Sequence, residues 1–250
     1  MIFDPPLTRG RFLRRYKRFF LDFETEGGVT LTAHCANTGS LSGCLVEGAP
    51  VLVQPNDNPK RSLRFSWKAI ELAGRWVGVD TGLAVPLTRE ALAQGLVPDL
   101  QGYPTIFGEV PYGRDMRSRI DLLLSRGGTI PQGVGKQARK LPVGDQRVYL
   151  EVKNTTLVED GIAMFPDAVT QRGQKHLEEL IHVVQKGHRA AMCYCVQRTD
   201  CETLRPADHI DPRYGELLRK AHDAGVELYA FRAEVSTATL LPTQRLPVRL

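Results

Sequence analysis

The sequence predicts an α/β protein (α+β overall) of two domains, a small β-barrel followed by a larger domain in which helices alternate with a mixed set of strands. A chain of 250 residues is longer than a typical single domain and can bury two cores. Short strand-like runs separated by turns occupy residues 10–79, whereas helical and strand-like patterns alternate from residue 87 onward. We therefore expect a first domain at residues 1–84 and a second at residues 85–250.

The first domain is predicted from short strands joined by tight turns. One long strand is expected at residues 11–24, a turn at residues 26–28 and a returning strand at residues 29–35. Further strands are expected at residues 50–54, 63–72 and 75–79. This spacing favours a small closed barrel, for which an OB-like barrel is the leading candidate and an SH3-like barrel the alternative.

The second domain is predicted to begin with a helix at residues 87–95, because Thr88 can cap its first turn and Gly95 can end it. Strands are then expected at residues 106–112, 117–124 and 146–153, with a loop rich in Gly and basic residues at 125–145. Part of that loop (GVGK, 133–136) resembles a phosphate-binding loop, but Ile130 and Gln137 stand where that motif needs Gly and Ser or Thr. The remaining elements are a loop at 154–169, helices at 170–186 and 214–224, and strands at 190–197 and 226–233.

Composition excludes several classes of protein. Hydrophobic residues at 42% and charged residues at 24% are ordinary globular values, which exclude a disordered or fibrous chain. Five cysteines without a Cys-x-x-Cys pair predict reduced thiols, not a disulfide framework or a zinc knuckle. The N-terminal segment lacks a basic region followed by a long apolar one, and no run approaches the ~20 apolar residues of a membrane span. We expect a cytoplasmic protein that does not enter a membrane.

The basic charge is concentrated near the N-terminus. The chain has 33 Lys and Arg against 28 Asp and Glu, and residues 9–18 hold six basic side chains, interleaved with aromatic rings, and no acid. Such a segment suits a polyanion, because cations that neutralise phosphates release condensed counterions and aromatic faces can stack on bases. A strand with one solvated basic face has the same pattern. The candidate nucleic-acid contacts are Arg9, Arg11, Arg14, Arg15, Lys17 and Arg18, together with Lys60 and Arg61 of a basic loop at 58–61.

Three charged side chains lie in runs that otherwise have the composition of buried strands. Asp121 lies within the second predicted strand of the second domain, and Glu151 and Lys153 lie at the end of the third. If these strands pair, the three side chains converge at one edge of the sheet, where a buried charge must pair or hold a cation. Because side chains alternate along a strand, Glu151 and Lys153 share one face and Val152 points to the other. A structural ion pair between Glu151 and Lys153 is the simpler alternative.

These groups are the ones that metal-assisted hydrolysis of a phosphodiester needs. Mg²⁺ takes oxygen ligands in octahedral geometry, is held by one or two carboxylates, and keeps several waters, one of which can attack phosphorus. A neighbouring ammonium can lower the pKa of such a water or stabilise the charge that develops on phosphorus. In the helix predicted at 170–186, Arg172, Gln174 and Lys175 occupy the first turn, where the helix dipole disfavours the two cations. This placement favours an anionic ligand, although a solvated helix also tolerates such charges.

The second domain resembles the PD-(D/E)xK nuclease fold in the order of its elements and in the placement of Asp121 and the EVK triplet at 151–153 on consecutive strands. The chain as a whole is similar to the sugar fermentation stimulation protein A family. This similarity rests on the runs LTRGRFLRRYKRF (7–19), AHCANTGS (33–40), NPKR (58–61), SRID (118–121), EVKN (151–154), FPDAVT (165–170), RGQKHL (172–177) and QR (197–198). Two positions depart from the family pattern, Ala36 where we expect Pro and Leu41 where we expect Met, and both affect a loop of the first domain.

The resemblance implies an N-terminal OB-like domain, a PD-(D/E)xK nuclease-like C-terminal domain, largely sequence-non-specific DNA binding and a regulatory role in sugar utilisation. By position, the residues that match the catalytic set of such nucleases are Asp121, Glu151, Lys153, Gln174 and Lys175, with Glu90 as a further carboxylate on the leading helix. Of these, Asp121 and Glu151 would hold Mg²⁺ or Mn²⁺.

Two functions therefore remain open. The first is a DNA-binding protein whose nuclease-like site hydrolyses phosphodiester bonds with Mg²⁺, acting on duplex DNA, on single-stranded DNA or on RNA. The second is a non-catalytic DNA-binding transcriptional regulator of sugar-utilisation genes built on a nuclease scaffold, because a fold does not fix a function.

Overall fold

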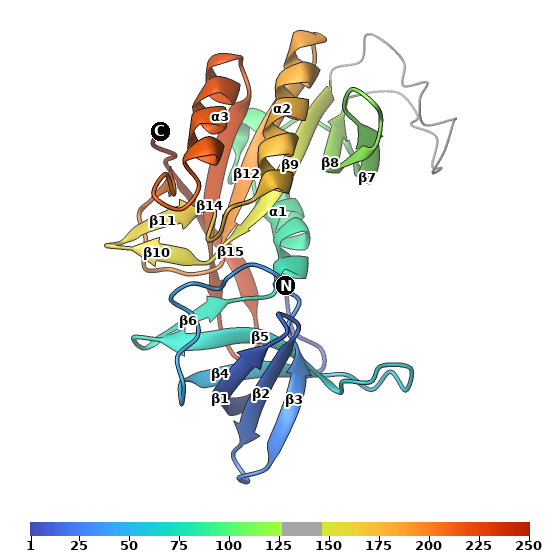
Figure 1. The fold of residues 1–250 in the computed structure, drawn as a ribbon. Coiled ribbons are helices and arrows are strands. Elements are labelled where there is room, and N and C mark those ends of the chain that lie inside the picture. Colours follow the sequence, from blue (N-terminus) through green and yellow to red (C-terminus); the bar gives the residue numbers. More distant parts are fainter. Residues whose placement is uncertain (127–146) are drawn as a thin grey trace.

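The computed structural model describes residues 1–126 and 147–250, which form two domains stacked end to end (Figure 1). The first domain, coloured blue to cyan, is a β-barrel, and the second is built from helices and a mixed sheet. The loop predicted at residues 125–145, with its 133–136 segment, lies outside the described residues except for Ser125 and Arg126. Within the described ranges, no helix is both long and apolar enough to cross a membrane.

The first domain is a six-stranded sheet, and five of its strands close into a barrel. Its strands are β1 (Thr8–Tyr16), β2 (Phe20–Thr25), β3 (Thr30–His34), β4 (Pro50–Pro55), β5 (Phe65–Leu72) and β6 (Arg75–Gly78). They are ordered β3-β2-β1-β4-β5-β6, and a parallel contact between His34 of β3 and Ser66 of β5 closes the barrel. Alternate side chains fill the interior, where Phe12, Phe23 and Trp67 are almost fully buried.

The single strand predicted at residues 11–24 is wrong, because the chain reverses within it. β1 and β2 form an antiparallel hairpin, and its turn contains Lys17 and Arg18 at φ 47° and 63°. Two consecutive residues with positive φ match the right-handed twist of hairpin strands, but Asn and Gly usually supply this conformation. Neither Lys17 nor Arg18 is a typical turn residue, so the strand-like pattern of the sequence continues through the turn and predicts one long strand.

The main sheet of the second domain has six strands in the order β15-β14-β12-β9-β8-β7. The strands are β7 (Thr105–Tyr112), β8 (Ser118–Ser125), β9 (Arg147–Thr155), β12 (Arg189–Val196), β14 (Glu227–Val235) and β15 (Leu240–Leu246). β9, β12 and β14 are parallel to one another, whereas β7, β8 and β15 run antiparallel to their neighbours. The sheet is therefore mixed, as expected.

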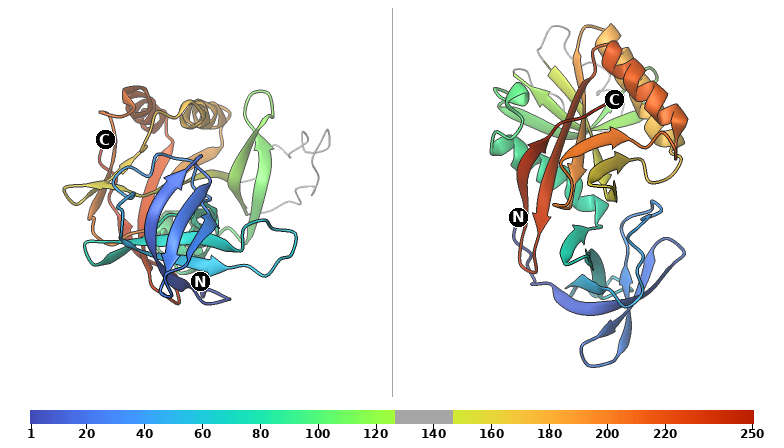
Figure 2. Two further views of the ribbon diagram at one scale, coloured as in Figure 1. Left: turned by 60° about the horizontal axis from the view of Figure 1, so that its bottom comes forward. Right: turned by 90° about the vertical axis from the view of Figure 1, so that its left-hand side faces the viewer.

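Helices cover both faces of this sheet (Figure 2). The helices are α1 (Ala84–Ala93) on one face, α2 (Gln171–Gln185) and α3 (Pro212–Asp223) on the other, and the short 3₁₀ helices η1 (Thr81–Leu83) and η2 (Pro98–Leu100). Alternation along β9 supplies both cores, since Tyr149 packs in the core under α2 and α3 whereas Leu150 and Val152 pack in the core under α1. The result is a three-layer α/β/α domain.

A small second sheet occupies the region predicted as a loop at residues 154–169. It contains β10 (Leu157–Glu159) and β11 (Ile162–Phe165), which pair with β13 (Thr203–Pro206). Strands of three or four residues carry too little alternation to be recognised. β15 is also absent from the predicted elements, because Pro242 within it suggests a break, although Pro is tolerated on an edge strand.

Local capping explains where the helices begin. The hydroxyl of Thr170 accepts a hydrogen bond from the N–H of Gly173 at 3.1 Å and starts α2 close to the predicted residue. Thr88 is not the predicted cap of the first helix, because its hydroxyl donates to the carbonyl of Ala84 at 2.8 Å inside α1. All five cysteines are buried, and none of them forms a disulfide.

Candidate metal and nucleic-acid site

The candidate site lies where the pairing of β8 with β9 ends. The ladder between these strands stops at the pair Leu122–Leu150, and the next residues towards the open end are Asp121 and Glu151. The ladder does not continue, because Oδ2 of Asp121 accepts a hydrogen bond from the main-chain N–H of Val152 at 2.7 Å. The two strands therefore separate at the carboxylates that the sequence places on them.

Glu151 is the centre of a buried polar cluster. Its Oε1 accepts a hydrogen bond from Nζ of Lys153 at 2.6 Å and contacts Nδ1 of His176. Nζ of Lys153 also lies 3.4 Å from Nδ1 of His176. The side chains of Glu151, Lys153 and His176 are 2%, 15% and 7% exposed. Glu151 and Lys153 share one face as predicted, and the ion pair considered as the simpler alternative is formed.

Burial and charge move the pKa values of the two carboxyl groups in opposite directions. Burial, reinforced by the negative charge of Glu151, raises the pKa of Asp121 from 3.8 to about 6. Burial alone would raise the pKa of Glu151 too, but the Lys153 ammonium and the hydrogen bond with His176 lower it below its usual 4.5. Above about pH 6 the site therefore holds two carboxylates, of which Asp121 is the more easily protonated.

Two buried oxygen atoms of this region have no hydrogen-bond partner among residues 1–126 and 147–250. They are Oε2 of Glu151 and the hydroxyl of Tyr112. Burial and the charges of Glu151, Glu179 and Asp121 raise the pKa of Tyr112, so its hydroxyl keeps its proton and can donate. A buried carboxylate oxygen without a donor is costly, so Oε2 of Glu151 needs a cation or a donor nearby.

The oxygen atoms of the site fit Mg²⁺ or Mn²⁺. Asp121 and Glu151 bring two carboxylates to the same strand ends, and Mg²⁺ is commonly held by one or two carboxylates with waters and substrate oxygens as its other ligands. In the part of the chain that the structure describes, no group of three or more His, Cys, Asp or Glu side chains is arranged to hold a metal. A cation bound here would therefore keep positions open for water or phosphate.

Gln174 and Lys175 are not brought into this cluster. The amide of Gln174 donates to both carboxylate oxygens of Asp211 at 2.9 and 3.1 Å, and Asp211 in turn caps α3. Gln174 thus ties α2 to the start of α3. Lys175 is exposed on α2, and Glu90 binds the N-terminal ammonium of Met1 at 2.9 Å. In the described residues, none of these three side chains forms a hydrogen bond or ion pair with Asp121 or Glu151.

His176 is the residue of α2 that reaches the cluster, and it is not among the residues predicted from the sequence. It shares the buried face of the helix with Leu177 and Leu180. A polar side chain on an apolar helix face is the signal that could have identified it, because a buried imidazole needs a partner. The packing of the helix on the sheet determines which carboxylate becomes the partner of His176.

A cleft of about 640 Å³ lies between the two domains and reaches part of the cluster. Asp121 and Lys153 line it from the second domain, as does Arg172 at the start of α2. Arg15 and Arg18 line it from the hairpin of the first domain. The cleft therefore joins the candidate metal site to part of the basic segment.

Hydrogen bonds between the domains border this cleft. The hydroxyl of Ser40 donates to the main-chain carbonyl of Asp167 at 2.5 Å, and the N–H of Leu41 donates to the Asp167 carboxylate at 2.8 Å. Gly39 packs against the same carboxylate so closely that a Cβ atom there would lie 2.9 Å from it. The loop that contains Ala36 and Leu41 is thus anchored on the second domain.

The basic residues of the first domain differ in their surroundings. The guanidinium of Arg9 lies over the ring of Trp76 at 5.7 Å, and Arg14 pairs with Asp22 at 2.8 Å. Arg15 is fully engaged, because it donates to the main-chain carbonyls of Arg18, Asn37, Gly39 and Ser40. Every member of the predicted set except Arg15 is exposed, and those without a contact to Trp76 or Asp22 are Arg11, Lys17, Arg18, Lys60 and Arg61. Arg15 therefore serves the local fold, whereas the exposed cations remain accessible to phosphate.

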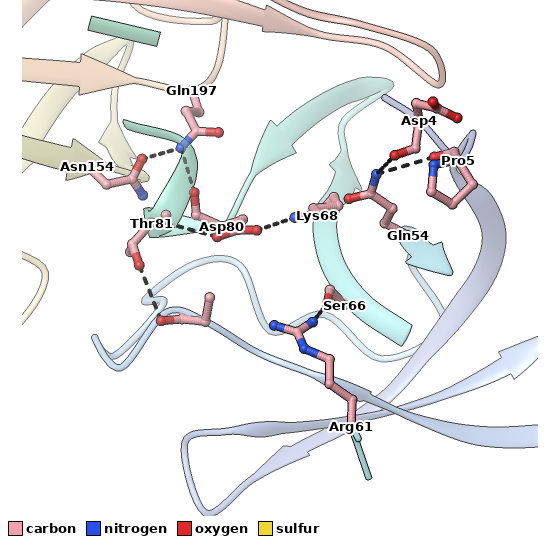
Figure 3. Close-up of polar contacts among 12 residues, drawn as sticks. Asp4, Pro5, Gln54, Arg61, Ser66, Lys68, Asp80, Thr81, Asn154 and Gln197 are labelled. Atoms are coloured by element: carbon pink, nitrogen blue, oxygen red, sulfur yellow. Dashed lines mark hydrogen bonds and ion pairs between the residues drawn. The ribbon is translucent and has the colours of Figure 1, made fainter. Parts of the chain in front are cut away.

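A polar junction fixes how the domains meet. The carboxylate of Asp80, just before η1, accepts a hydrogen bond from Nζ of buried Lys68 at 2.5 Å. The amide of Gln197 donates to the carbonyl of Asp80 at 3.0 Å and to Oδ1 of Asn154 at 2.5 Å, as Figure 3 shows. Because Asn154 follows Lys153 on β9, the junction connects the barrel to the strand that carries the site.

A second polar cavity, of about 530 Å³, lies on the barrel side of this junction. Gln54, Arg61, Ser66 and Lys68 line it. Figure 3 shows Gln54 donating to the main-chain oxygens of Asp4 and the next residue, and Arg61 donating to Ser66 at 3.3 Å. Because these donors already have protein partners, this cavity is a weaker candidate for a ligand site than the interdomain cleft.

Two family models match the chain and divide it between its domains. Residues 13–79 match the SfsA N-terminal OB domain, and residues 82–239 match the sugar fermentation stimulation protein RE domain. The barrel is therefore an OB domain, and the SH3-like alternative is set aside.

Individual proteins are similar over the full length. The chain is 47% identical over 250 residues to the sugar fermentation stimulation protein homolog of Geotalea daltonii, covering 100% of both chains. It is 46% identical over 248 residues to the homolog of Geobacter sulfurreducens, covering 99% of this chain and 98% of that one. The solved structure of Pyrococcus furiosus SfsA in complex with Ca²⁺ is similar with a TM-score of 0.83 at 27% identity, covering 100% of this chain and 98% of that chain.

Proposed function

The chain belongs to the sugar fermentation stimulation protein family, and we propose that it binds DNA and hydrolyses phosphodiester bonds with a divalent cation at Asp121 and Glu151. The OB domain and the interdomain cleft would hold the nucleic acid. Mg²⁺ or Mn²⁺ would be the cation. Reduced, buried cysteines suit the cytoplasm, where we expect the protein to act.

Glu151 is the residue that most strongly supports a metal-dependent function. Its side chain is only 2% exposed, its pKa is lowered, and its Oε2 has no partner in the described ranges. A purely structural ion pair with Lys153 would leave that oxygen unsatisfied. A cation shared with Asp121 would satisfy it and would offset the repulsion between the two carboxylates.

The residues around Glu151 have separable roles in this proposal. A bound cation would activate a water and offset the charge of a phosphate. Lys153 and His176 hold Oε1 of Glu151, which leaves Oε2 for the cation and fixes the side chain. Lys153 also lines the cleft, so its ammonium would stabilise charge on a phosphate bound there.

The relative from Pyrococcus furiosus supports a cation site in the family, because its structure contains Ca²⁺. Ca²⁺ and Mg²⁺ both prefer oxygen ligands, although Mg²⁺ requires shorter bonds and stricter geometry. The two carboxylates of this chain are the corresponding kind of donor.

The test is a cleavage assay on labelled single-stranded, duplex and branched DNA and on RNA, with Mg²⁺ or Mn²⁺. We expect cleavage that EDTA stops and that Asp121→Ala or Glu151→Ala lowers by about 100-fold or more. Gel-shift binding without metal should survive in both variants and weaken with salt, since phosphate contacts release counterions. Glu178→Ala, which removes an exposed acid of α2, is the control and should cleave normally.

Retained DNA binding without cleavage under either metal would instead favour the non-catalytic regulator. Binding that does not respond to salt would contradict the contribution of the basic side chains.

A further inference from the structure

The turn of the β1–β2 hairpin carries an exposed aromatic side chain next in the chain to an arginine that lines the interdomain cleft. Phe19 directly follows Arg18, which lines the cleft, and the side chain of Phe19 is 46% exposed. Large apolar side chains are normally buried, and this one lies in the turn of the β1–β2 hairpin, whose tip points towards the second domain (Figure 2). An exposed ring among cations is the arrangement that stacks on nucleic-acid bases.

The hairpin turn is held rigidly in this position. Lys17 and Arg18 both have positive φ, a conformation that costs energy for side chains with a Cβ atom and persists only when the surroundings enforce it. Arg15 enforces it by donating to the carbonyl of Arg18 at 3.1 Å while its other hydrogen bonds hold the 37–40 loop. The loop is anchored in turn to Asp167. Arg18 and Phe19 are thus presented from a fixed turn.

Cations approach the cleft from both domains. Arg18 lines it from the barrel, Arg172 lines it from the first turn of α2, and Lys153 lies between the domains beside Asp121. Neither Arg18 nor Arg172 forms an ion pair with a carboxylate of the described chain, and both are exposed. Unpaired guanidinium groups on two sides of one cleft suit successive phosphates of one backbone.

The dimensions of the cleft restrict what can reach Asp121 and Lys153. A volume of about 640 Å³ lies within the ~300–1,000 Å³ range of small-ligand sites. A few nucleotides of one strand fit such a space. A single strand needs less width than a duplex, whose major groove alone is about 12 Å wide. The hydrogen bonds from Ser40 and Leu41 to Asp167 also border the cleft and limit its opening.

We propose that the cleft binds single-stranded DNA, with Phe19 stacked on an unpaired base and Arg18 and Arg172 bound to phosphates on either side of the phosphodiester at Lys153. This inference rests on the proposed function and specifies its substrate. Stacking on Phe19 requires a base whose face is free, and the faces of duplex bases are covered by their neighbours. The single strand is therefore selected by both the ring and the size of the cleft.

The test is fluorescence anisotropy of the full chain in EDTA, so that binding is measured without cleavage. The probes are fluorescein-labelled oligo(dT), a blunt duplex of the same length, and oligo(U). We expect oligo(dT) to bind at least about tenfold more tightly than the duplex, and Phe19→Ala to weaken binding of oligo(dT) by about tenfold. Arg18→Ala and Arg172→Ala should each reduce the slope of log affinity against log salt by about 0.7, the value for one phosphate of a single strand.

Two variants remote from the cleft serve as controls. Val29→Ala removes an apolar side chain that is 56% exposed next to the β2–β3 turn, and Lys220→Ala removes an exposed cation of α3. Both should bind oligo(dT) like the parent chain. Because all five substituted positions are exposed, thermal melting should show that the variants are folded.

The outcomes separate this inference from the proposed function. The single-strand site would be overturned if the duplex bound as tightly as oligo(dT) or more tightly. It would also be overturned if Phe19→Ala and Arg18→Ala bound oligo(dT) like the parent chain. If such a protein still cleaved duplex DNA in a manner dependent on Asp121, the proposed function would stand alone. Tighter binding of oligo(U) than of oligo(dT) would overturn the assignment to DNA. Failure to bind any of the probes would overturn both proposals.

Discussion

The carboxylate of Asp121 accepts a hydrogen bond from the main-chain N–H of Val152, at the point where β8 and β9 stop pairing. This bond satisfies a backbone donor that the ladder leaves free, and it holds the acid beside the charge of Glu151. Burial, together with the charge of Glu151, raises the pKa of Asp121, although the hydrogen bond from Val152 acts in the opposite direction. Burial of the charged Asp121 next to Glu151 therefore destabilises the fold at the candidate site, as is often found at functional sites.

Asp121→Asn should make the metal-free protein more stable at neutral and alkaline pH. Asn keeps an oxygen that can accept from Val152 but carries no charge to be buried. The rise in pKa from 3.8 to about 6 corresponds to at most about 3 kcal/mol. In the parent chain, the stability that comes from protonated Asp121 is complete below pH 3.8 and is lost as the pH rises through about 6.

Urea unfolding in EDTA at pH 8 and pH 5 measures this difference. The variant should exceed the parent chain by about 1–3 kcal/mol at pH 8 and by less at pH 5. Glu178→Gln, an exposed acid, should show no such gain. A variant that is less stable than the parent at pH 8 would contradict the raised pKa.

Divalent cations should stabilise the protein through Glu151. Binding of a ligand to the folded state alone raises the free energy of unfolding, by about 2.7 kcal/mol at a concentration 100 times Kd. We expect Mg²⁺, Mn²⁺ or Ca²⁺ to raise Tm in the parent chain at pH 8 and to leave Glu151→Gln unchanged. Glu90→Gln is the matched control, because Glu90 binds Met1 and should not affect the response. An equal rise in Tm for Glu151→Gln would exclude this site.

His176→Ala should weaken the cluster by removing a partner of Glu151. The loss of one partner from a buried charged group costs about 1–3 kcal/mol, and we expect unfolding free energy at pH 7 to fall by that amount. His182→Ala, on the same helix but only partly buried, should cost less than about 0.5 kcal/mol. Equal losses for the two variants would show that the contact between His176 and Glu151 contributes nothing specific.

Gly78→Ala should disturb the contact between the domains. A Cβ atom at Gly78 would lie 2.8 Å from Cβ of Gln197, which is fully buried and bonded to Asp80 and Asn154. Overpacking of this kind costs about 1–3 kcal/mol. Gly27→Ala, which meets only the Thr25 hydroxyl at 3.8 Å, is the control for replacing a glycine of the barrel. Chemical denaturation of both variants measures the effect, and equal stabilities would argue against a tightly packed junction.

Local periodicity in the sequence was sufficient to predict which strands carry Asp121, Glu151 and Lys153. Residues two apart on a strand share a face whatever the rest of the chain does, so Glu151 and Lys153 could be paired from sequence. Asp121 could be assigned to the preceding strand because its neighbours are apolar and its own charge is out of place there. The same reasoning could not find the turn at Lys17 and Arg18, where the surrounding hydrogen bonds override the residues' own preference.

The packing of α2 determines which of its residues contacts the site, and the sequence did not predict this. Gln174, Lys175 and His176 are consecutive, and a rotation of about 100° per residue sends each in a different direction. Only the contact of α2 with β9 and α3 determines that His176 meets Glu151 while Gln174 meets Asp211. No short-range pattern contains that information.

The sequence by itself determined the two-domain order, the strands that carry Asp121, Glu151 and Lys153, and the basic segment that opens the barrel. These features depend on alternation, turn residues and composition, which act over a few neighbouring positions. The tertiary structure alone decided that β8 and β9 separate at the carboxylates, that His176 completes the cluster, and that Arg18 and Arg172 face one cleft. Those relationships join residues far apart in the chain, and packing between elements and between domains fixes them.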